Sequence, residues 1–470
     1  MKHALVRELD QEFKLWAQFA AQPPLRTESE LADARSKVLT KWATPNTGSR
    51  EHKNEKPDLY RTPYQRDRDR VLWSSGLRRL SNKTQLFPAE HDEDLRQRLT
   101  HSIEVYQLAS TIGASFGLDG DLIEAGALAH DIGHTPFGHA GEHALNKLFN
   151  TVEAQLGGFN HYEHGVDVVR FLEGPYYASS ATQFSGLNLS DEVLECIFKH
   201  TYCHTGEFGS EDLWKWSKHQ ARIKKGYCHL EGQAVRAADK ISYLVSDIED
   251  GIRLNCLSSE DLLSCRLFHR PPLNLHRNQQ LPLREQFLLQ RRILIKILME
   301  DILEASSKRL SFLPSASVEK VREASDYTIQ HSEELQEEIG EVWKKLQAGK
   351  LHKDGRVVAA NLQAARITAE LTTVYSLIPD LVDNGFRKEY ERLKSSSYFD
   401  VYASRLGKRR KLRFRQLLVS FLPMHLLIGS KIEPGADIDV EIEDLIMEKD
   451  YVAGLSDNRA RTLHSQILGA

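Results

Sequence analysis

The sequence HDIGHTPFGHAGEH, residues 130–143, concentrates side chains that bind metal ions and transfer protons. Four histidines, one aspartate and one glutamate fall within these fourteen positions. Imidazole and carboxylate together suit Mn, Fe, Co, Ni or Zn, and histidine also acts as a general acid or base near neutral pH. The motif therefore indicates metal-assisted chemistry that includes a proton transfer.

Helical periodicity predicts that two of the histidines in this part of the chain face the interior. His101 shares one stripe of residues 98–112 with apolar side chains, and His130 does the same at the end of residues 121–130. Asp119 or Asp121 could cap the second helix. The two imidazoles are thus expected to converge from separate helices.

A third helix, expected over residues 231–251, places Asp239, Tyr243 and Asp247 on successive turns of one face. Buried carboxylates need a partner, and a divalent cation can provide it. A single buried histidine is more often a core residue than a ligand, but several inward donors together favour a site. The predicted metal ligands are His101, His130, Asp131 and Asp239. They leave coordination positions open for water and a phosphate oxygen, as in a catalytic site.

The end of the motif predicts a turn and a new helix. Gly133 and Pro136 should end the helix that carries His130, and the next helix should begin near residue 137 or 138. On it, His139 and Glu142 stand three residues apart, so the carboxylate can orient the imidazole and raise its pKa, as a general acid requires. His143 is interpreted as a surface or helix-packing residue.

The elements that position these residues are expected to be helical. From Tyr60 to about residue 380 the apolar periodicity is mostly that of helices, and no strand-helix alternation suggests a parallel sheet. Residues 4–20 carry an apolar helical stripe that needs a partner, and residues 44–58 are polar enough for a mobile linker. The segment DIDVEIED, 437–444, alternates as a strand does, which predicts a small C-terminal β element.

Composition excludes several classes of protein. The 470 residues carry a net charge of −4, which gives no global attraction to nucleic acid or anionic membrane. Five scattered cysteines without a CxxC pair indicate a reducing compartment. The N-terminus is charged, and the apolar stretch 417–429 is too short to span a bilayer and contains Pro423. A cytoplasmic protein is expected.

Two basic segments leave alternatives open. Arg66 and Arg68 either meet phosphate groups or belong to a solvated helix face with ion pairs. The run GKRRKLRFR, 407–415, could hold an effector nucleotide, bind single-stranded DNA, or cover a surface helix.

Four motifs together closely resemble those of the HD-domain deoxynucleoside triphosphate triphosphohydrolases, the dGTPase family. They are RLTHS (98–102), HDIGHTPFGHAGE (130–142), FNHYEH (159–164) and ADKISYLVSD (238–247). The resemblance extends over about residues 60–460. This chain departs from the family pattern at His164, where glutamine is common, and in LSDNRA at 455–460.

The resemblance implies a fold, a domain plan and site residues. The fold is expected to be all-α, with an HD-domain helical core and a small C-terminal α+β element. The expected units are an N-terminal helical extension (1–43), a linker (44–59), the catalytic core (60–265) and a mostly helical region (266–470) that completes the domain and contributes to an oligomer interface. The family metal ligands coincide with the four residues selected above. The expected catalytic residues are His139, Glu142 and His134; the expected substrate contacts are Arg79, Arg98, His161 and Lys240 at the phosphates and Gln85, Leu86, Tyr243 and Asp247 at the deoxyribose.

The implied reaction is attack of a metal-activated water on the α-phosphorus of a dNTP, which releases the deoxynucleoside and intact tripolyphosphate. The expected cofactor is a divalent transition metal (Mn, Fe, Co or Ni), with Mg as the candidate second ion, and dGTP is the candidate preferred substrate. The expected partners are a dNTP effector, single-stranded DNA and further copies of the chain in a tetramer or hexamer. Two alternatives remain: another HD-type nucleotide phosphodiesterase, and a non-catalytic nucleotide-sensing or DNA-binding module.

Overall fold

The structure of the 470-residue chain is a computed structural model. It describes residues 27–46, 49–53, 55–87, 92–152, 158–174, 176–179, 182–184, 186–201, 219, 221–273, 281–394, 399, 411–414 and 438–468. The apolar stripe expected at residues 4–20, the stretch 417–429 and most of the basic run 407–415 lie outside the described residues.

The described elements are almost all helices, as expected. The first half contains α2 (Glu28–Ser36), α3 (Pro63–Trp73), α4 (Ser75–Arg79), α5 (Arg98–Phe116), α6 (Gly120–Ala129), α7 (His139–Val152), α8 (His161–Asp167) and α9 (Asp191–Lys199). The second half contains α11 (Leu230–Arg253), α12 (Ser259–Leu263), α13 (Leu283–Phe312), α14 (Val318–Arg322), α15 (Glu333–Val342), α16 (Gly355–Leu377), α17 (Asn384–Lys394), α21 (Ile442–Gly454) and α22 (Asp457–Leu468). None of these helices is both long and apolar enough to cross a membrane.

Four strands accompany the helices in two antiparallel pairs. β1 (Tyr176–Ser179) pairs with β2 (Thr182–Phe184), and β3 (Lys411–Phe414) pairs with β4 (Ile438–Glu441). The strand expected at 437–444 is therefore shorter than predicted, because helix α21 begins at Ile442. Among the described residues of the C-terminal region the other elements are helices, and the expected α+β element is not supported.

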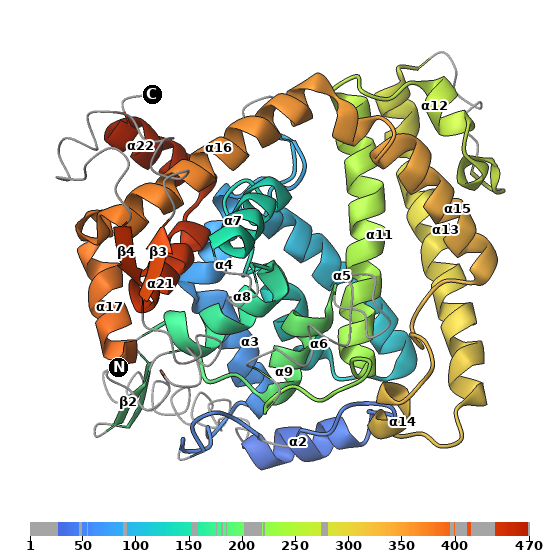
Figure 1. Cartoon of the computed structure of the whole chain (residues 1–470). Coiled ribbons are helices and arrows are strands. Elements are labelled where there is room, and N and C mark those ends of the chain that lie inside the picture. The colour runs from blue at the N-terminus through green and yellow to red at the C-terminus, as the bar shows by residue number, and fades with distance from the viewer. Residues whose placement is uncertain are drawn as a thin grey trace, which may run out of the picture.

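Helices α5, α6 and α11 form the centre of the molecule and pack against one another. Figure 1 shows α11 between α5 on one side and α13 and α15 on the other. The inward stripe of α5 is apolar at Val105 and Ile112, and α11 contributes Ile241 and Ile248; these side chains are at most 1% exposed. Burial of such side chains stabilises the fold by about 1.5–3 kcal/mol each. The metal ligands expected on these helices thus lie beside a buried apolar core.

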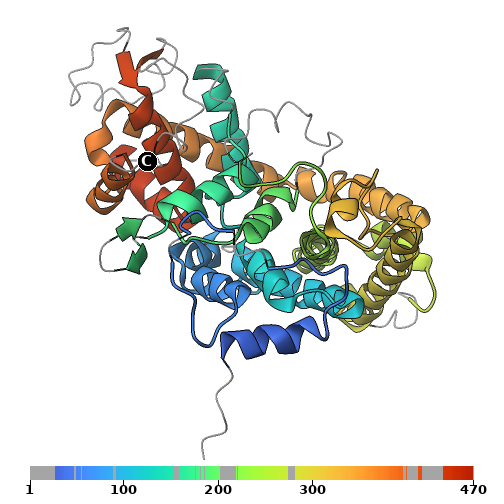
Figure 2. The ribbon, with the colours of Figure 1, turned by 90° about the horizontal axis from the view of Figure 1, so that it is seen from below.

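Helix α16 crosses the molecule above α7 and connects its two sides (Figure 1). It packs on α7, α21 and α22, where Leu371 and Tyr375 are fully buried in a separate apolar cluster. In the view turned by 90°, α17, α21 and α22 lie on one side of the central helices and α13 and α15 on the other (Figure 2). Helix α16 therefore closes over the face of the core that carries the histidine motif.

Local sequence explains where the two histidine-bearing helices begin and end. Helix α5 ends at Gly117, which has a left-handed φ of 63°, a conformation that glycine adopts without steric cost. Asp119 caps α6 by accepting hydrogen bonds from the backbone N–H groups of Asp121 and Leu122. Three residues, 117–119, connect α5 to α6, so His101 and His130 are presented by neighbouring helices.

Part of the segment expected as a linker contacts the core. The Thr44 backbone N–H donates to Glu231 over 2.8 Å, and Arg50, which is 4% exposed, donates to Asp67 over 2.5 Å. The described residues of this segment are therefore tied to α3 and α11 by hydrogen bonds. The domain boundaries themselves stay a prediction.

Candidate metal and phosphate site

The four residues predicted as metal ligands lie together at the meeting point of α5, α6 and α11. His101 Nε2 is 2.8 Å from Asp239 Oδ1. His130 Nε2 is 3.5 Å from Asp131 Oδ1 and 3.8 Å from Asp239 Oδ1. Three of the four, His101, His130 and Asp131, have ligand atoms within 4.8 Å of one another. These separations suit donors that share one ion.

His130 carries the atom that best tests whether a metal fits here. It is fully buried, and its Nδ1 donates to the Ala127 carbonyl over 2.6 Å. Its Nε2 has no hydrogen-bond partner among the described residues. A buried polar atom without a partner is costly, and a bare imidazole lone pair is a metal ligand. The donor set therefore fits a divalent transition metal.

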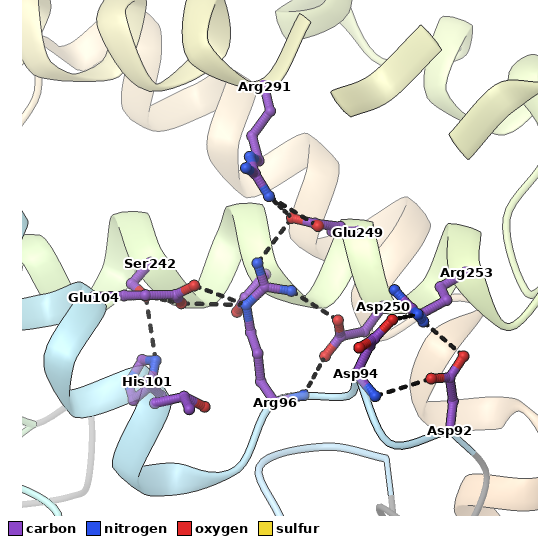
Figure 3. A network of polar contacts seen from close by, with 12 residues as sticks. Asp92, Asp94, Arg96, His101, Glu104, Ser242, Glu249, Asp250, Arg253 and Arg291 are labelled. Carbon is purple, nitrogen blue, oxygen red and sulfur yellow. Dashed lines mark hydrogen bonds and ion pairs between the residues drawn. The ribbon is translucent and has the colours of Figure 1, made fainter. Parts of the chain in front are cut away.

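A chain of polar contacts behind His101 fixes the orientation of its ring (Figure 3). Ser242 Oγ lies 3.3 Å from His101 Nδ1 and donates to Glu104 over 3.3 Å. Glu104 accepts from Arg96 over 3.0 Å, and Arg96 also donates to Asp250 on α11 over 2.8 Å. Polar partners behind a ligating histidine set its tautomer and its direction. Here they hold Nε2 of His101 toward Asp239.

Asp131, one of the four expected metal ligands, also contacts Arg98 and His134. Its Oδ2 accepts from Arg98 Nη1 over 2.8 Å, and its Oδ1 is 3.0 Å from His134 Nδ1. Burial alone would raise the pKa of Asp131, but His134, His130 and Arg98 outweigh it and hold this pKa well below its usual value. Asp131 is thus an anion that can bind a cation.

Residues 130–138 turn back against α8, and Gly133 permits their close approach. A Cβ atom at Gly133 would stand 1.9 Å from the His161 carbonyl oxygen and 2.3 Å from the Gly165 nitrogen. Only a residue without a side chain fits such a contact between backbones. The rings of His134 and His161 stack with their centroids 3.8 Å apart as a result.

Three further contacts anchor the same turn. Lys83 Nζ donates to the His134 carbonyl, and His164 Nδ1 donates to the Gly133 carbonyl over 2.9 Å. Asp457 accepts from the Phe137 N–H over 2.7 Å. His164 and Asp457 belong to the two segments that depart from the family pattern. In this structure both segments hold the backbone of the turn in place. The turn is thus held by hydrogen bonds from three separate segments: the loop at Lys83, helix α8 at His164 and helix α22 at Asp457.

Helix α7 begins at His139, slightly later than the sequence predicted. Phe137 and Gly138 both adopt left-handed conformations, with φ of 62° and 58°. A right-handed helix cannot start through two such residues. The turn therefore places His139 at the first helical position.

Glu142 holds two histidines at once. Its Oε2 is 3.0 Å from His139 Nδ1, and its Oε1 is 2.9 Å from His161 Nδ1. Burial would raise the pKa of Glu142, but His161 and His139 hold it well below its usual value. The side chain of His139 is 59% exposed, whereas that of His161 is 6% exposed. Of the two imidazoles, only His139 extends into open space.

These groups line a cavity of about 660 Å³, a volume within the usual range of ligand pockets. Most of the expected site residues form one wall: Gln85, Leu86, Arg98, His101, Asp131, His134, His139, His161, Asp239, Lys240 and Tyr243. The opposite wall comes from α16, which contributes Val358, Asn361 and Leu362. His143, interpreted above as a surface or packing residue, is exposed and lines the cavity as well.

Several expected residues do not line this cavity. Arg79 donates to Glu173 over 3.1 Å and lies beside a smaller pocket instead. Asp247 is 1% exposed and accepts from Gln347 over 3.0 Å, so it lies behind the wall. Arg68 donates to Asp121 over 3.0 Å, and Arg66 is 3.7 Å from Glu55; neither lines the cavity.

His200 lines the cavity and was not singled out from the sequence. It follows the last residue of α9 and is 2% exposed. Its ring centroid is 5.1 Å from that of His130, and burial lowers its pKa to about 3. The apolar stripe of α9 could have identified His200 as a residue at the buried end of a helix.

Comparisons with known proteins identify relatives of this chain. Residues 98–244 match the family model of the HD domain. The chain is 33% identical over 353 residues to a deoxyguanosinetriphosphate triphosphohydrolase-like protein of Roseobacter denitrificans, a match that covers 73% of this chain and 86% of the relative. Proteins with the same name from Caulobacter sp. and Bordetella pertussis are each 35% identical; the matches cover 68% and 76% of this chain and 80% and 90% of the relatives. The chain belongs to the deoxyguanosinetriphosphate triphosphohydrolase-like family of HD-domain proteins.

Proposed function

We propose that the protein is a metal-dependent dNTP triphosphohydrolase, which converts a dNTP and water into a deoxynucleoside and tripolyphosphate. One observation carries the proposal: three of the four candidate metal ligands and the Glu142-paired His139 line one cavity of about 660 Å³, and the fourth candidate, the buried His130, lies 3.5 Å from Asp131. The names of the relatives support the same class of substrate.

The candidate ligands are His101, His130, Asp131 and Asp239, whose buried donors fit a divalent transition metal. A bound ion would act as a Lewis acid and lower the pKa of a bound water. Arg98 and Lys240, which line the same wall, would neutralise part of the charge of the triphosphate. Such groups stabilise charge that develops at phosphate oxygens.

His139 is the candidate general acid. Hydrolysis at the α-phosphorus breaks the bond to O5′ of the deoxynucleoside, and this oxygen must take up a proton. The exposed ring of His139 is held at Nδ1 by Glu142, so its Nε2 is directed away from that carboxylate. Glu142 therefore orients the imidazole so that its other nitrogen is available to donate a proton to the leaving oxygen.

His134 and His161 are the candidate contacts of the phosphate oxygens, and Tyr243, Leu86 and Gln85 those of the deoxyribose. A tyrosine ring packed against C2′ would exclude a ribose by size. Asp247 lies behind Tyr243 rather than on the cavity wall, so its proposed contact with the sugar would need a movement of that ring.

Product analysis tests the proposal. The Mn-loaded protein is incubated with dATP, dCTP, dGTP and dTTP, singly and together, and the phosphate products are separated. Intact tripolyphosphate is the expected product, and stimulation only in mixtures would indicate an effector nucleotide. Pyrophosphate or a monophosphate would instead support another HD-type phosphodiesterase, and salt-sensitive DNA binding without turnover a non-catalytic module.

A further inference from the structure

Two buried cysteines meet a histidine where helix α9 packs against the start of α11. Cys196 lies on α9, and Cys228 and His229 directly precede the first residue of α11. All three are at most 2% exposed, and their two sulfur atoms and one imidazole nitrogen lie within 4.8 Å of one another. None of the three lines the cavity described above. Soft thiolates together with an imidazole favour zinc.

The carboxylate of Glu231 sets the direction of the His229 ring. Its Oε2 is 3.0 Å from His229 Nδ1, nearer than the Gly232 N–H at 3.3 Å. Glu231 also accepts from the Thr44 backbone N–H over 2.8 Å and from the Thr44 hydroxyl over 2.5 Å, as an ionised carboxylate does. The hydrogen of the neutral ring therefore lies on Nδ1, and Nε2 is bare. Carboxylates hold zinc-binding histidines in this way.

The Nε2 atom of His229 faces two electron-rich atoms. The Glu192 carbonyl oxygen is 3.1 Å from it, and Cys196 Sγ is 3.8 Å from it. A proton on this nitrogen would engage a single acceptor, whereas a metal ion would engage the nitrogen, both sulfurs and the carbonyl oxygen. Zinc bonds of about 2.0–2.3 Å at tetrahedral angles place the ligand atoms about 3–4 Å apart. The cluster therefore fits a closed, four-coordinate site.

Two glycines leave room for the sulfur atoms. A Cβ atom at Gly232 would stand 2.1 Å from Cys228 Sγ and 3.4 Å from Cys196 Sγ. A Cβ atom at Gly126, on α6, would stand 2.9 Å from Cys196 Sγ. A side chain at either position would displace a sulfur, so glycine permits this close approach. The backbone of α6 and α11 is thus shaped around the two thiols.

We propose that Cys196, Cys228 and His229 bind a structural zinc ion, with the Glu192 carbonyl oxygen as the fourth ligand. Binding releases the protons of the two thiols to solvent, and the resulting thiolates offset the charge of the ion. The ion would join α9 to the start of α11, the helix that also carries Asp239. This site goes beyond the proposed function and does not depend on it.

Cobalt binding to the full, reduced chain tests the site, because cobalt replaces zinc in tetrahedral sites and its spectrum reports the ligands. Thiolate ligands give a charge-transfer band in the near ultraviolet, which nitrogen and oxygen ligands do not give. The wild type should show this band with CoCl₂, and an excess of ZnCl₂ should abolish it. X-ray absorption of the zinc-loaded chain should show sulfur at about 2.3 Å from the ion. Cys228→Ser should lose at least half of the band, since it removes one of two thiolates.

Cys265→Ser is the matched control. Cys265 is also fully buried, and it belongs to no cluster of possible ligands among the described residues. This variant should keep the full band. His130→Ala separates the two metal sites, because it removes a candidate ligand of the catalytic ion and should leave the thiolate band unchanged.

Absence of the band in the wild type would overturn the zinc site, whether or not Cys228→Ser folds. An undiminished band in a folded Cys228→Ser would overturn it as well. The spectrum is recorded without nucleotide, so it is independent of the reaction. A chain that shows the band but releases no tripolyphosphate would refute the proposed function and leave the zinc site standing.

Discussion

Glu142 contacts two histidines that have different surroundings. One oxygen holds the exposed ring of His139 and the other the buried ring of His161. A carboxylate bound in this way stays ionised, because both neighbours lower its pKa. The ring of His139 is thus open to solvent at the side away from Glu142, whereas that of His161 is enclosed.

Two alanine variants are expected to differ in what they lose: His130→Ala should lose bound metal, and His139→Ala should lose turnover alone. His130→Ala removes a buried ligand, so bound Mn and tripolyphosphate release should be lost together. His139→Ala should keep its Mn and lose turnover by about 10²–10⁴-fold, the usual contribution of a general acid. Metal analysis of both variants, with rates on the same samples, checks this. Equal loss of metal in the two would contradict the role of His139.

Asp247 should make stability depend on pH. Burial raises the pKa of this carboxyl to about 7, against hydrogen bonds from Gln347 and Tyr243 that lower it. Between about pH 4 and 7 the folded state keeps a proton that the unfolded state has lost, so stability falls as pH rises and levels off above 7.

Asp247→Asn should remove that contribution. The stability of the variant relative to the wild type should increase by up to about 1.4 kcal/mol per pH unit across this window. Urea unfolding of both proteins at a series of pH values measures the difference. The slope that remains in the variant belongs to other groups, among them Asp250, whose pKa burial raises to about 6. Parallel curves for the two proteins would exclude a raised pKa at Asp247.

Periodicity in the sequence was sufficient to place some of these residues and not others. His101 and His130 lie on apolar helical stripes, and both are buried as predicted, at 1% and 0% exposure. Asp247 shares its helical face with Asp239, yet it lies behind the cavity wall, because the depth of a side chain depends on neighbours such as Gln347 from a distant segment. His200 also lies on an apolar stripe, with Val193 and Ile197 before it, but this spacing indicates only burial and gives no sign of the other histidines that it meets in the folded chain.

At the scale of elements, the turn between α6 and α7 is the part that shapes the site. Its backbone lies against α8, and its position decides where the rings of His134 and His161 stack. The sequence predicted the turn from Gly133 and Pro136, since both interrupt helices. It could not predict the anchors at Lys83, His164 and Asp457, which come from segments that meet only in the folded chain.

Gly133→Ala should displace this turn. The added Cβ would overlap backbone atoms of α8, which cannot yield as a flexible side chain would. Overpacking of this kind costs about 1–3 kcal/mol, to be measured as a loss in the free energy of urea unfolding. Gly120→Ala, in the first turn of α6, is the control, because nothing lies within 4 Å of its Cβ position. Equal stability of the two variants would show that the turn can move without cost.

At the scale of the whole molecule, one carboxylate ties the C-terminal helix to the beginning of the catalytic half. Asp457, at the start of α22, accepts from the Thr84 N–H over 2.9 Å and from its hydroxyl over 2.6 Å, besides the Phe137 N–H. These bonds join residues that are more than 300 positions apart. The C-terminal segment is thus part of the support of the site.

Asp457→Asn should weaken that connection. One amide nitrogen would replace an acceptor, so the backbone N–H of either Thr84 or Phe137 would lose its partner, at a cost of about 1–3 kcal/mol. Turnover should fall while bound Mn is retained, because the metal ligands lie on other helices. Asp380→Asn is the control, since that side chain is 87% exposed and its ion-pair partner among the described residues is Arg387 on the surface. Unchanged unfolding and turnover in Asp457→Asn would contradict this support.

The Asp457 contact also bears on the order of events during synthesis. A ribosome makes the chain from its N-terminus, and the Phe137 amide waits for an acceptor that is added 320 residues later. A nascent or prematurely terminated polypeptide can contain every candidate ligand of the metal while the loop that bears His134 lacks its final tether. The loop is therefore fully held only in chains whose translation has passed the start of α22.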